Sequence, residues 1–340
     1  MVLAARKWTA LLFCLLVGVG LALLGPRARA DAPTVAVAEA HRDFVDSRRT
    51  NWRGTGPRPL KTVVWYPSAP TPADAAEPAV SSHMPRYSLI LISHGSGGDA
   101  QSMAWLGRYL AAHGYIAAAV NHIGGSGDEI VLAGQFPITE WQMWERARDL
   151  SVVLDKLLAD PVFGPRIDRD RIGAAGFSLG GYTAIALGGA RLNLERLAAK
   201  SPSPPPGLLP SLPKAIAEDK ELRIANPIVR ASAARSGDSY EDRRVRAIFA
   251  LAPAIGCGFE PSGLAPVHVP VRIVVGHDDQ ITPPVDNAEY YARLIHGAAL
   301  TVLPGEAGHF IKVQDPAQQA QILDQVSAIA VAFFAQTLVR

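Results

Sequence analysis

The feature that most constrains the fold is a short stretch centred on Ser178. Residues 172–177 form an apolar run typical of a strand, and residues 181–187 have the small and apolar side chains of a buried helix. Between them, Gly176, Ser178 and Gly180 match G-x-S-x-G, in which a serine on a sharp strand-to-helix turn presents its hydroxyl above a sheet edge. Glycines are needed there because the turn leaves no room for Cβ atoms. The stretch therefore predicts a strand, a tight turn and a helix.

The first 30 residues have the pattern of a secretory signal peptide. A basic start precedes the almost wholly apolar residues 8–24, and Ala28-Arg29-Ala30 offers an A-x-A cleavage site. We expect residues 1–30 to be a cleaved leader that directs export to the bacterial periplasm or the medium. An uncleaved membrane anchor is the alternative, because the apolar run is near the lower length limit for a span.

Cleavage of this leader would change the charge balance. The leader contains four of the 33 Lys and Arg residues and none of the 31 Asp and Glu residues, so the cleaved chain would carry a small net negative charge. Nothing in that balance favours nucleic acid or an anionic surface as a partner. Cys257 is the only cysteine after the leader, which excludes an intrachain disulfide and favours a buried thiol over a nucleophile.

The rest of the chain alternates between predicted strands and helices. Apolar runs that indicate buried strands lie at residues 87–93 and 115–120, and further apolar runs that indicate strands lie at residues 245–251, 271–276 and 299–303. Helical patterns lie at residues 100–113, 138–160, 287–295 and 317–338. We expect antiparallel edge strands at residues 34–38 and 60–66. The alternation predicts the α/β class, with a mostly parallel central sheet and helices on both faces.

The alternation stops between about residues 191 and 244. Six prolines fall between Pro202 and Pro213. A stretch of this length inside an α/β unit is usually functional. We therefore expect a cap or lid insertion over the site, within a single domain that spans residues 31–340.

A carboxylate and a histidine follow two later predicted strands. A serine hydroxyl needs an adjacent base, and the base needs a third group that fixes its tautomer. Asp278 and Asp279 follow the strand at residues 271–276, and His309 follows the strand at residues 299–303. The chain order of serine, acid and histidine is the order found in α/β-hydrolases.

The chain resembles the α/β-hydrolase superfamily, and in particular the bacterial predicted dienelactone hydrolase group related to platelet-activating-factor acetylhydrolases. Besides the turn at Ser178, the resemblance is carried by residues 58–67, 93–98, 121–122, 276–283 and 308–309. It implies Ser178 as nucleophile, His309 as base and Asp279 as the acid, with Asp278 as the alternative. It also implies an oxyanion hole made by the backbone N–H groups of Leu179 and Ser96.

These roles imply a serine hydrolase that cleaves a small carboxylic ester through an acyl-enzyme, with short acyl chains preferred by resemblance. A lactonase or peptidase with the same triad, and a catalytically silent hydrolase fold used for binding, are the alternatives. His122, Trp141 and Cys257 are candidates for the pocket wall, although the spacing of Trp141 and Trp144 fits core residues better. We expect no cofactor, no metal, no nucleic acid and, after cleavage, no membrane attachment.

Overall fold

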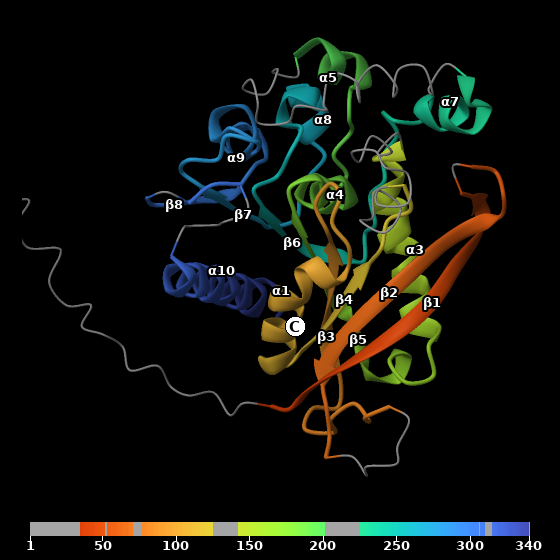
Figure 1. The fold of residues 1–340 in the computed structure, drawn as a ribbon, viewed down its shortest axis with the longest axis vertical. Coiled ribbons are helices and arrows are strands. Elements are labelled where there is room, and N and C mark those ends of the chain that lie inside the picture. The colour runs from red at the N-terminus through yellow and green to blue at the C-terminus, as the bar shows by residue number, and fades with distance from the viewer. Residues whose placement is uncertain are drawn as a thin grey trace, which may run out of the picture. The chain divides into compact units, whose positions relative to one another are not determined.

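An eight-stranded sheet runs through the part of the chain that the structure describes (Figure 1). The structure is a computed structural model that describes residues 35–51, 53–70, 77–124, 142–200, 225–305, 307–309 and 315–339. In chain order the strands are β1 (Val37–Thr50), β2 (Pro57–Pro67), β3 (Tyr87–Ser93), β4 (Tyr115–Val120), β5 (Ile167–Phe177), β6 (Val245–Leu251), β7 (Val271–Gly276) and β8 (Ala299–Leu303). Across the sheet their order is β1-β2-β4-β3-β5-β6-β7-β8.

The sheet is parallel from β4 to β8, and only β1 and β2 run antiparallel to their neighbours. From β3 the chain crosses to β4 on one side, whereas from β5 it crosses to β6 on the other side. The carboxyl ends of β3 and β5 lie next to each other, with Ser93 paired to Gly176. This reversal of winding direction is the position at which open α/β sheets place their ligand sites.

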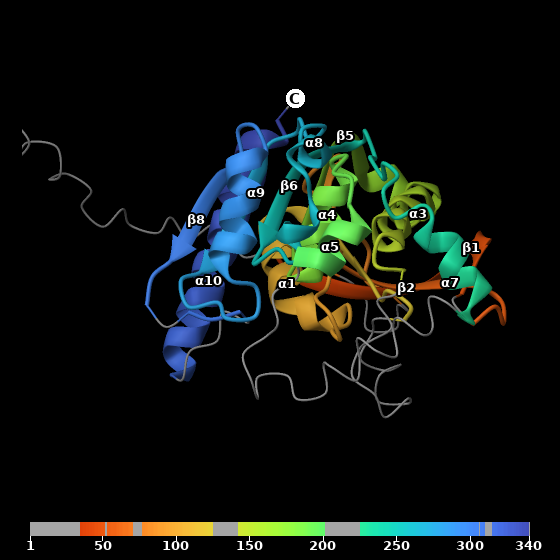
Figure 2. The same cartoon turned by 90° about the horizontal axis from the view of Figure 1, so that it is seen from above.

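Helices cover both faces of the sheet. Buried side chains of α1 and α10 pack on one face, and those of α3, α4 and α9 pack on the other (Figure 1). Figure 2 shows β8 and the β1–β2 hairpin at opposite ends of the sheet. The helices are α1 (Ala104–Ala112), α3 (Glu145–Ala159), α4 (Leu179–Leu187), α5 (Leu194–Lys200), α7 (Pro227–Ala233), α8 (Pro261–Leu264), α9 (Ala288–Leu294) and α10 (Pro316–Thr337). Single 3₁₀ turns lie at Gln101–Met103, Gly164–Arg166, Gly256–Gly258 and Pro284–Asp286.

The five apolar runs predicted as strands are confirmed as β3, β4, β6, β7 and β8, with the predicted bounds. The bounds of the first strand were wrong, because β1 begins at Val37 and continues through a polar stretch to Thr50. That stretch is extended because its backbone pairs with β2, not because it is apolar.

Two of the expected segments lie mainly outside the described residues. These are the leader, and the part of the insertion from residue 201 to residue 224. The described ends of the insertion contain α5 and α7. Among the described helices, none has the length and apolarity that crossing a bilayer requires.

Candidate active site

The turn between β5 and α4 holds Ser178 in a backbone conformation that few side chains adopt. Its φ is 56° and its ψ is −118°, which is strained for a residue other than glycine. The flanking glycines allow this turn to form. A Cβ atom on Gly176 would lie 2.0 Å from the Gly180 carbonyl oxygen, and one on Gly180 would lie 2.0 Å from the Ser93 carbonyl oxygen. The predicted strand, turn and helix are therefore present, and their close packing requires glycine at both positions.

Three residues that are far apart in the sequence meet above the carboxyl end of the sheet. His309 Nε2 lies 2.9 Å from Ser178 Oγ, and His309 Nδ1 lies 2.9 Å from Asp279 Oδ2. All three side chains are buried. With Nδ1–H donating to the carboxylate, the imidazole accepts the serine hydroxyl proton at Nε2, which is the arrangement that a general base requires.

Asp279 is held in place by four hydrogen bonds. Its Oδ1 accepts from the backbone N–H groups of Ile281 and Thr282, at 3.0 and 2.8 Å. Its Oδ2 accepts from the Thr282 hydroxyl at 2.8 Å as well as from His309. The Thr282 hydroxyl also lies 3.0 Å from His309 Nδ1. Thr282 is thus part of the site, although its sequence position within residues 276–283 did not by itself assign it a role.

The neighbouring carboxylate, Asp278, lies elsewhere. Its side chain is about half exposed, and its Oδ1 lies 2.6 Å from His277 Nδ1. Of the two aspartates that the sequence left open, the structure brings only Asp279 to His309.

The loops that carry the acid and the histidine are joined to each other. The backbone N–H of Asp278 donates to the Ala307 carbonyl at 3.1 Å. A Cβ atom on Gly276 would lie 2.1 Å from that same oxygen, so glycine at this position permits the close approach. Asp279 and His309 are therefore placed by one hydrogen-bonded pair of loops at the ends of β7 and β8.

The two backbone N–H groups expected to form the oxyanion hole belong to Leu179, which follows Ser178, and to Ser96, which lies in the turn after β3. Leu179 is the first residue of α4, so its N–H has no partner within the helix and lies at the positive end of the helix dipole. Ser96 lies in the exposed turn after β3, which is closed by a hydrogen bond from Gly98 N–H to the Gly95 carbonyl at 3.2 Å. A Cβ atom on Gly95 would lie 3.3 Å from Ser178 Cβ, so this turn is in contact with the nucleophile.

The candidates for the pocket wall occupy different environments. His122 is 1% exposed and both of its ring nitrogens are within hydrogen-bond distance of other side chains, so it does not line an open pocket. Trp144 is fully buried, with its indole N–H donating to Ser232 Oγ at 2.8 Å, and Trp141 lies outside the described residues. Cys257 lies in a half-buried 3₁₀ turn after β6, where burial and the nearby Asp286 carboxylate raise the pKa of its thiol.

The fold and these contacts define the class to which the protein belongs. The sequence model of the alpha/beta hydrolase family matches residues 89–322, which is more than half of the chain. The chain therefore belongs to the alpha/beta hydrolase family, as the resemblance implied.

The individual proteins to which the chain is similar include cutinases, an acetylhydrolase and an esterase. The chain is 32% identical to cutinase est2 of Thermobifida alba over 111 residues, 32% of each chain. It is 31% identical to a platelet-activating factor acetylhydrolase of Bos taurus over 139 residues, 29% of this chain and 31% of that protein. The matches thus span about a third of the length of these curated relatives. A solved ferulic acid esterase from Streptomyces cinnamoneus has the same fold, with a TM-score of 0.59, 20% identity and coverage of 91% of this chain and 92% of that one.

Proposed function

We propose that the protein is a serine hydrolase that cleaves carboxylic esters through an acyl-enzyme intermediate. The observation that carries the proposal is the chain of two 2.9 Å contacts from Ser178 through His309 to Asp279. A catalytically silent fold has no need of these contacts together with a strained serine. The relatives named cutinase, acetylhydrolase and esterase favour esters as substrates over amides.

In the proposed reaction, Ser178 Oγ attacks the ester carbonyl carbon while His309 Nε2 accepts the hydroxyl proton. The N–H groups of Leu179 and Ser96 stabilise the carbonyl oxygen as it becomes negatively charged, and each such donor contributes about 3–4 kcal/mol to transition-state stabilisation. His309 then donates its proton to the departing alkoxide. Water attacks the acyl-enzyme in the second half-reaction, with His309 again as base, and releases the acid and Ser178.

Asp279 orients His309 throughout this cycle. Its four hydrogen bonds hold the carboxylate so that Nδ1 of His309 keeps its proton and Nε2 faces the nucleophile. By family resemblance, we propose that the acyl group is short. Export is proposed on the leader pattern of residues 1–30 alone.

The test compares the parent protein with Ser178→Ala on p-nitrophenyl acetate. We expect kcat/KM to fall by a factor on the order of 10⁴ or more, because the substitution removes the nucleophile while the fold remains. A fluorophosphonate probe should label the parent at Ser178 and leave the variant unlabelled. Equal hydrolysis by the two proteins, or labelling at another residue, would contradict the proposal.

Acyl specificity needs a separate experiment. Rates on p-nitrophenyl esters from acetate to laurate should decline as the acyl chain lengthens. A maximum at long chains would contradict the proposed preference but leave the serine mechanism intact.

A further inference from the structure

A second series of serine, histidine and aspartate contacts joins the ends of β3 and β4 to α3. Ser93 Oγ at the end of β3 lies 2.9 Å from His122 Nε2, just beyond the end of β4. His122 Nδ1 lies 2.9 Å from Asp149 Oδ2 on α3. The atoms and distances are those of the Ser178 site, but Ser93, His122 and Asp149 are 0%, 1% and 0% exposed. No substrate reaches Ser93, so this second chain of contacts has no nucleophile to offer.

Asp149 is charged despite its burial. Arg58 donates two hydrogen bonds to its carboxylate, at 2.6 and 2.7 Å, and Arg49 donates a third at 2.7 Å. Burial alone would raise the pKa of Asp149, but the two guanidinium groups hold it well below its usual range. The carboxylate is therefore a fixed acceptor for His122.

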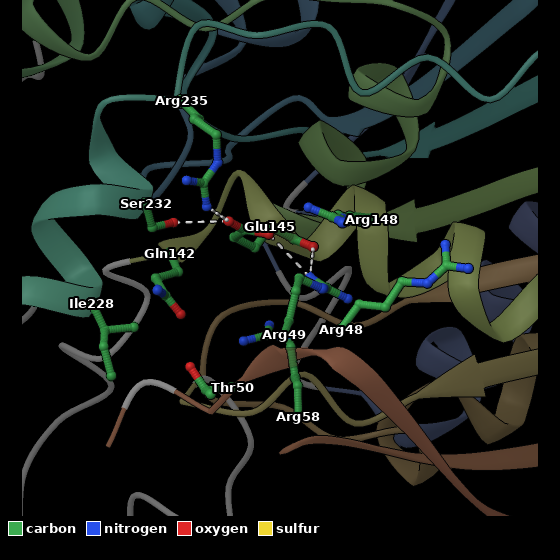
Figure 3. A pocket seen from close by; sticks show the side chains of 10 residues that line it. All are labelled: Arg48, Arg49, Thr50, Arg58, Gln142, Glu145, Arg148, Ile228, Ser232 and Arg235. Carbon is green, nitrogen blue, oxygen red and sulfur yellow. Dashed lines mark hydrogen bonds and ion pairs between the residues drawn. The ribbon is translucent and has the colours of Figure 1, made fainter. Parts of the chain in front are cut away.

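Arg49 is itself held by a second carboxylate, that of Glu145. Arg49 also donates to Glu145 Oε2 at 3.1 Å, and Glu145 Oε1 accepts from Ser232 and Arg235 at 2.9 and 3.2 Å (Figure 3). These groups line a pocket of about 260 Å³ beside α7 and the β1–β2 hairpin. Within this pocket wall Arg49 and Arg58 are paired with carboxylates, and these pairs anchor Asp149.

The two buried histidines are neutral, and their tautomers follow from their partners. Burial and the nearby Arg146 guanidinium lower the pKa of His122 to about 3, so Nδ1–H donates to Asp149 and Nε2 accepts from Ser93. Burial and the same guanidinium hold the pKa of His94 well below its usual range. His94 Nε2 accepts from the backbone N–H of His122 at 3.2 Å, which leaves Nδ1–H to donate to the Gly95 carbonyl at 2.7 Å.

The hydrogen bond from His94 to the Gly95 carbonyl also sets the direction of the Ser96 N–H. The Gly95 carbonyl and the Ser96 N–H belong to one planar trans peptide, in which C=O and N–H point in opposite directions. When His94 holds the carbonyl, the direction of the Ser96 N–H is therefore set as well. Arg146 reinforces this placement by donating to the carbonyl of His94 itself.

The same turn is packed against the nucleophile. A Cβ atom on Gly95 would lie 3.0 Å from Phe177 and 3.3 Å from Ser178, and Gly180 of α4 approaches the carbonyl of Ser93 so closely that it has no room for a larger side chain. A displacement of about 1 Å in an active-site group can cost about a hundredfold in rate. The end of β3 must therefore be held firmly if the oxyanion donor is to stay in place.

We propose that the buried Ser93–His122–Asp149 chain is a positioning device for the oxyanion hole, acting through His94 to orient the Gly95–Ser96 peptide. The inference rests on the proposed function, because it assigns a task within that reaction. Ser93, His122 and Asp149 are positioning residues and do not touch the substrate. The Ser178 triad activates the nucleophile, whereas this second chain sets the direction of a donor to the developing oxyanion.

The test uses Ser93→Ala, which removes one hydroxyl from the device, and Ser88→Ala as its matched control. Ser88 is a buried serine on the same strand, β3, at the end away from the site. Hydrolysis of p-nitrophenyl acetate is measured per active site titrated with a fluorophosphonate, so that misfolded protein is not counted. We expect kcat to fall about tenfold for Ser93→Ala, with KM within about twofold of the parent, because the lost orientation matters mainly in the transition state.

A boronic acid that forms a tetrahedral adduct with Ser178 provides a readout that a structural role would not move. Its affinity should weaken by the same factor as kcat, since the adduct oxygen occupies the oxyanion position. His122→Asn, which has no group at the position of Nε2, should reproduce both losses. Ser88→Ala should show neither.

The inference is overturned if both Ser93→Ala and His122→Asn lower the melting temperature but keep kcat per titrated site and boronate affinity within about twofold of the parent. A parent protein that neither hydrolyses the ester nor reacts with the fluorophosphonate would overturn the proposed function, and the inference with it. That failure is visible before any variant is made, so the two outcomes are distinguishable.

Discussion

The protein contains the same three side chains in the same order of contact twice, and the two sets differ in what surrounds them. Ser178 lies on a strained turn with a helix N-terminus beside it, whereas Ser93 lies within the sheet, at the end of β3. Asp279 is held by backbone N–H groups and a threonine, whereas Asp149 is held by two arginines. Serine, histidine and aspartate at hydrogen-bond distance therefore do not by themselves mark a catalytic site. Under the proposed function, the strained turn and the helix N-terminus are what distinguish the Ser178 set from the Ser93 set.

The largest difference between the two sets should come from replacing each aspartate by asparagine. Asp279→Asn should lower kcat about 10⁴-fold, because an amide N–H directed at Nδ1 favours the wrong tautomer of His309. The free energy of unfolding should change little, and urea denaturation followed beside the kinetics would check this. A fall in kcat of less than about a hundredfold would show that Asp279 is not the orienting acid.

Asp149→Asn should give the opposite signature. Removing this charge leaves Arg58 without its carboxylate partner and Arg49 with only Asp46 and Glu145, and breaking a buried pair in this way costs about 3–5 kcal/mol of stability. The loss of kcat per titrated site should be only about tenfold. Urea denaturation and ester hydrolysis of the same preparation measure both quantities, and a larger kinetic loss than that of Asp279→Asn would reverse the proposed division of labour.

The pH dependence of stability should sharpen the contrast. His122 has a folded-state pKa of about 3 against an ordinary value of 6.5, so between these values the unfolded chain binds a proton that the folded chain does not. The unfolding free energy therefore falls as the pH is lowered, by about 1.4 kcal/mol per pH unit from this group. Above its ordinary pKa, His122 is neutral in both states and adds no pH dependence to the unfolding free energy.

This contribution can be isolated by comparing the parent with His122→Asn in urea at about pH 6 and pH 4.5. The parent should lose about 2 kcal/mol more than the variant over this interval. Equal losses would mean that His122 titrates normally in the folded protein.

The smallest expected effect concerns Thr282. Thr282→Val removes the hydroxyl that donates to Asp279 and should cost about 1 kcal/mol of orientation, or about fivefold in kcat, with KM unchanged. Thr62→Val is a suitable control, because Thr62 is also buried and donates to a backbone carbonyl of β2 outside the site. If the two variants had equal kcat, the Thr282 hydroxyl would have no part in orienting the triad.

The sequence predicted the bounds of the strands from β3 to β8 that are apolar runs better than those of β1 at the other edge of the sheet. Strands such as β3 and β7 are apolar runs that end where a turn begins, so their bounds could be derived from composition alone. The pattern of β1 could not, because arginines and aspartates line it and its extension depends on pairing with β2. Hairpin pairing is a contact between segments, and no local pattern encodes its length.

The Ser178 site could likewise be predicted from the sequence, whereas the buried contacts of Ser93, His122 and Asp149 could not. Ser178, Asp279 and His309 each follow a predicted strand, so chain order and position were enough to bring them together as a hypothesis. Asp149 lies within a helix and Arg58 at the start of a strand, 91 residues away. One signal was present, because Asp149 is a charged residue beside the apolar positions of its helix, but its partners could not be read from the chain.

The contact between Gly180 and the Ser93 carbonyl bears on any attempt to transfer this site to another protein. The five residues around Ser178 therefore cannot be moved to another protein by themselves. Helix α4 packs directly against the end of β3, so that end must occupy the same position in the new protein. A graft that carried Ser178, Asp279 and His309 alone would reproduce the nucleophile and lose the geometry of Ser96. The smallest transferable piece also includes the ends of β3 and β4 and the first turns of α3.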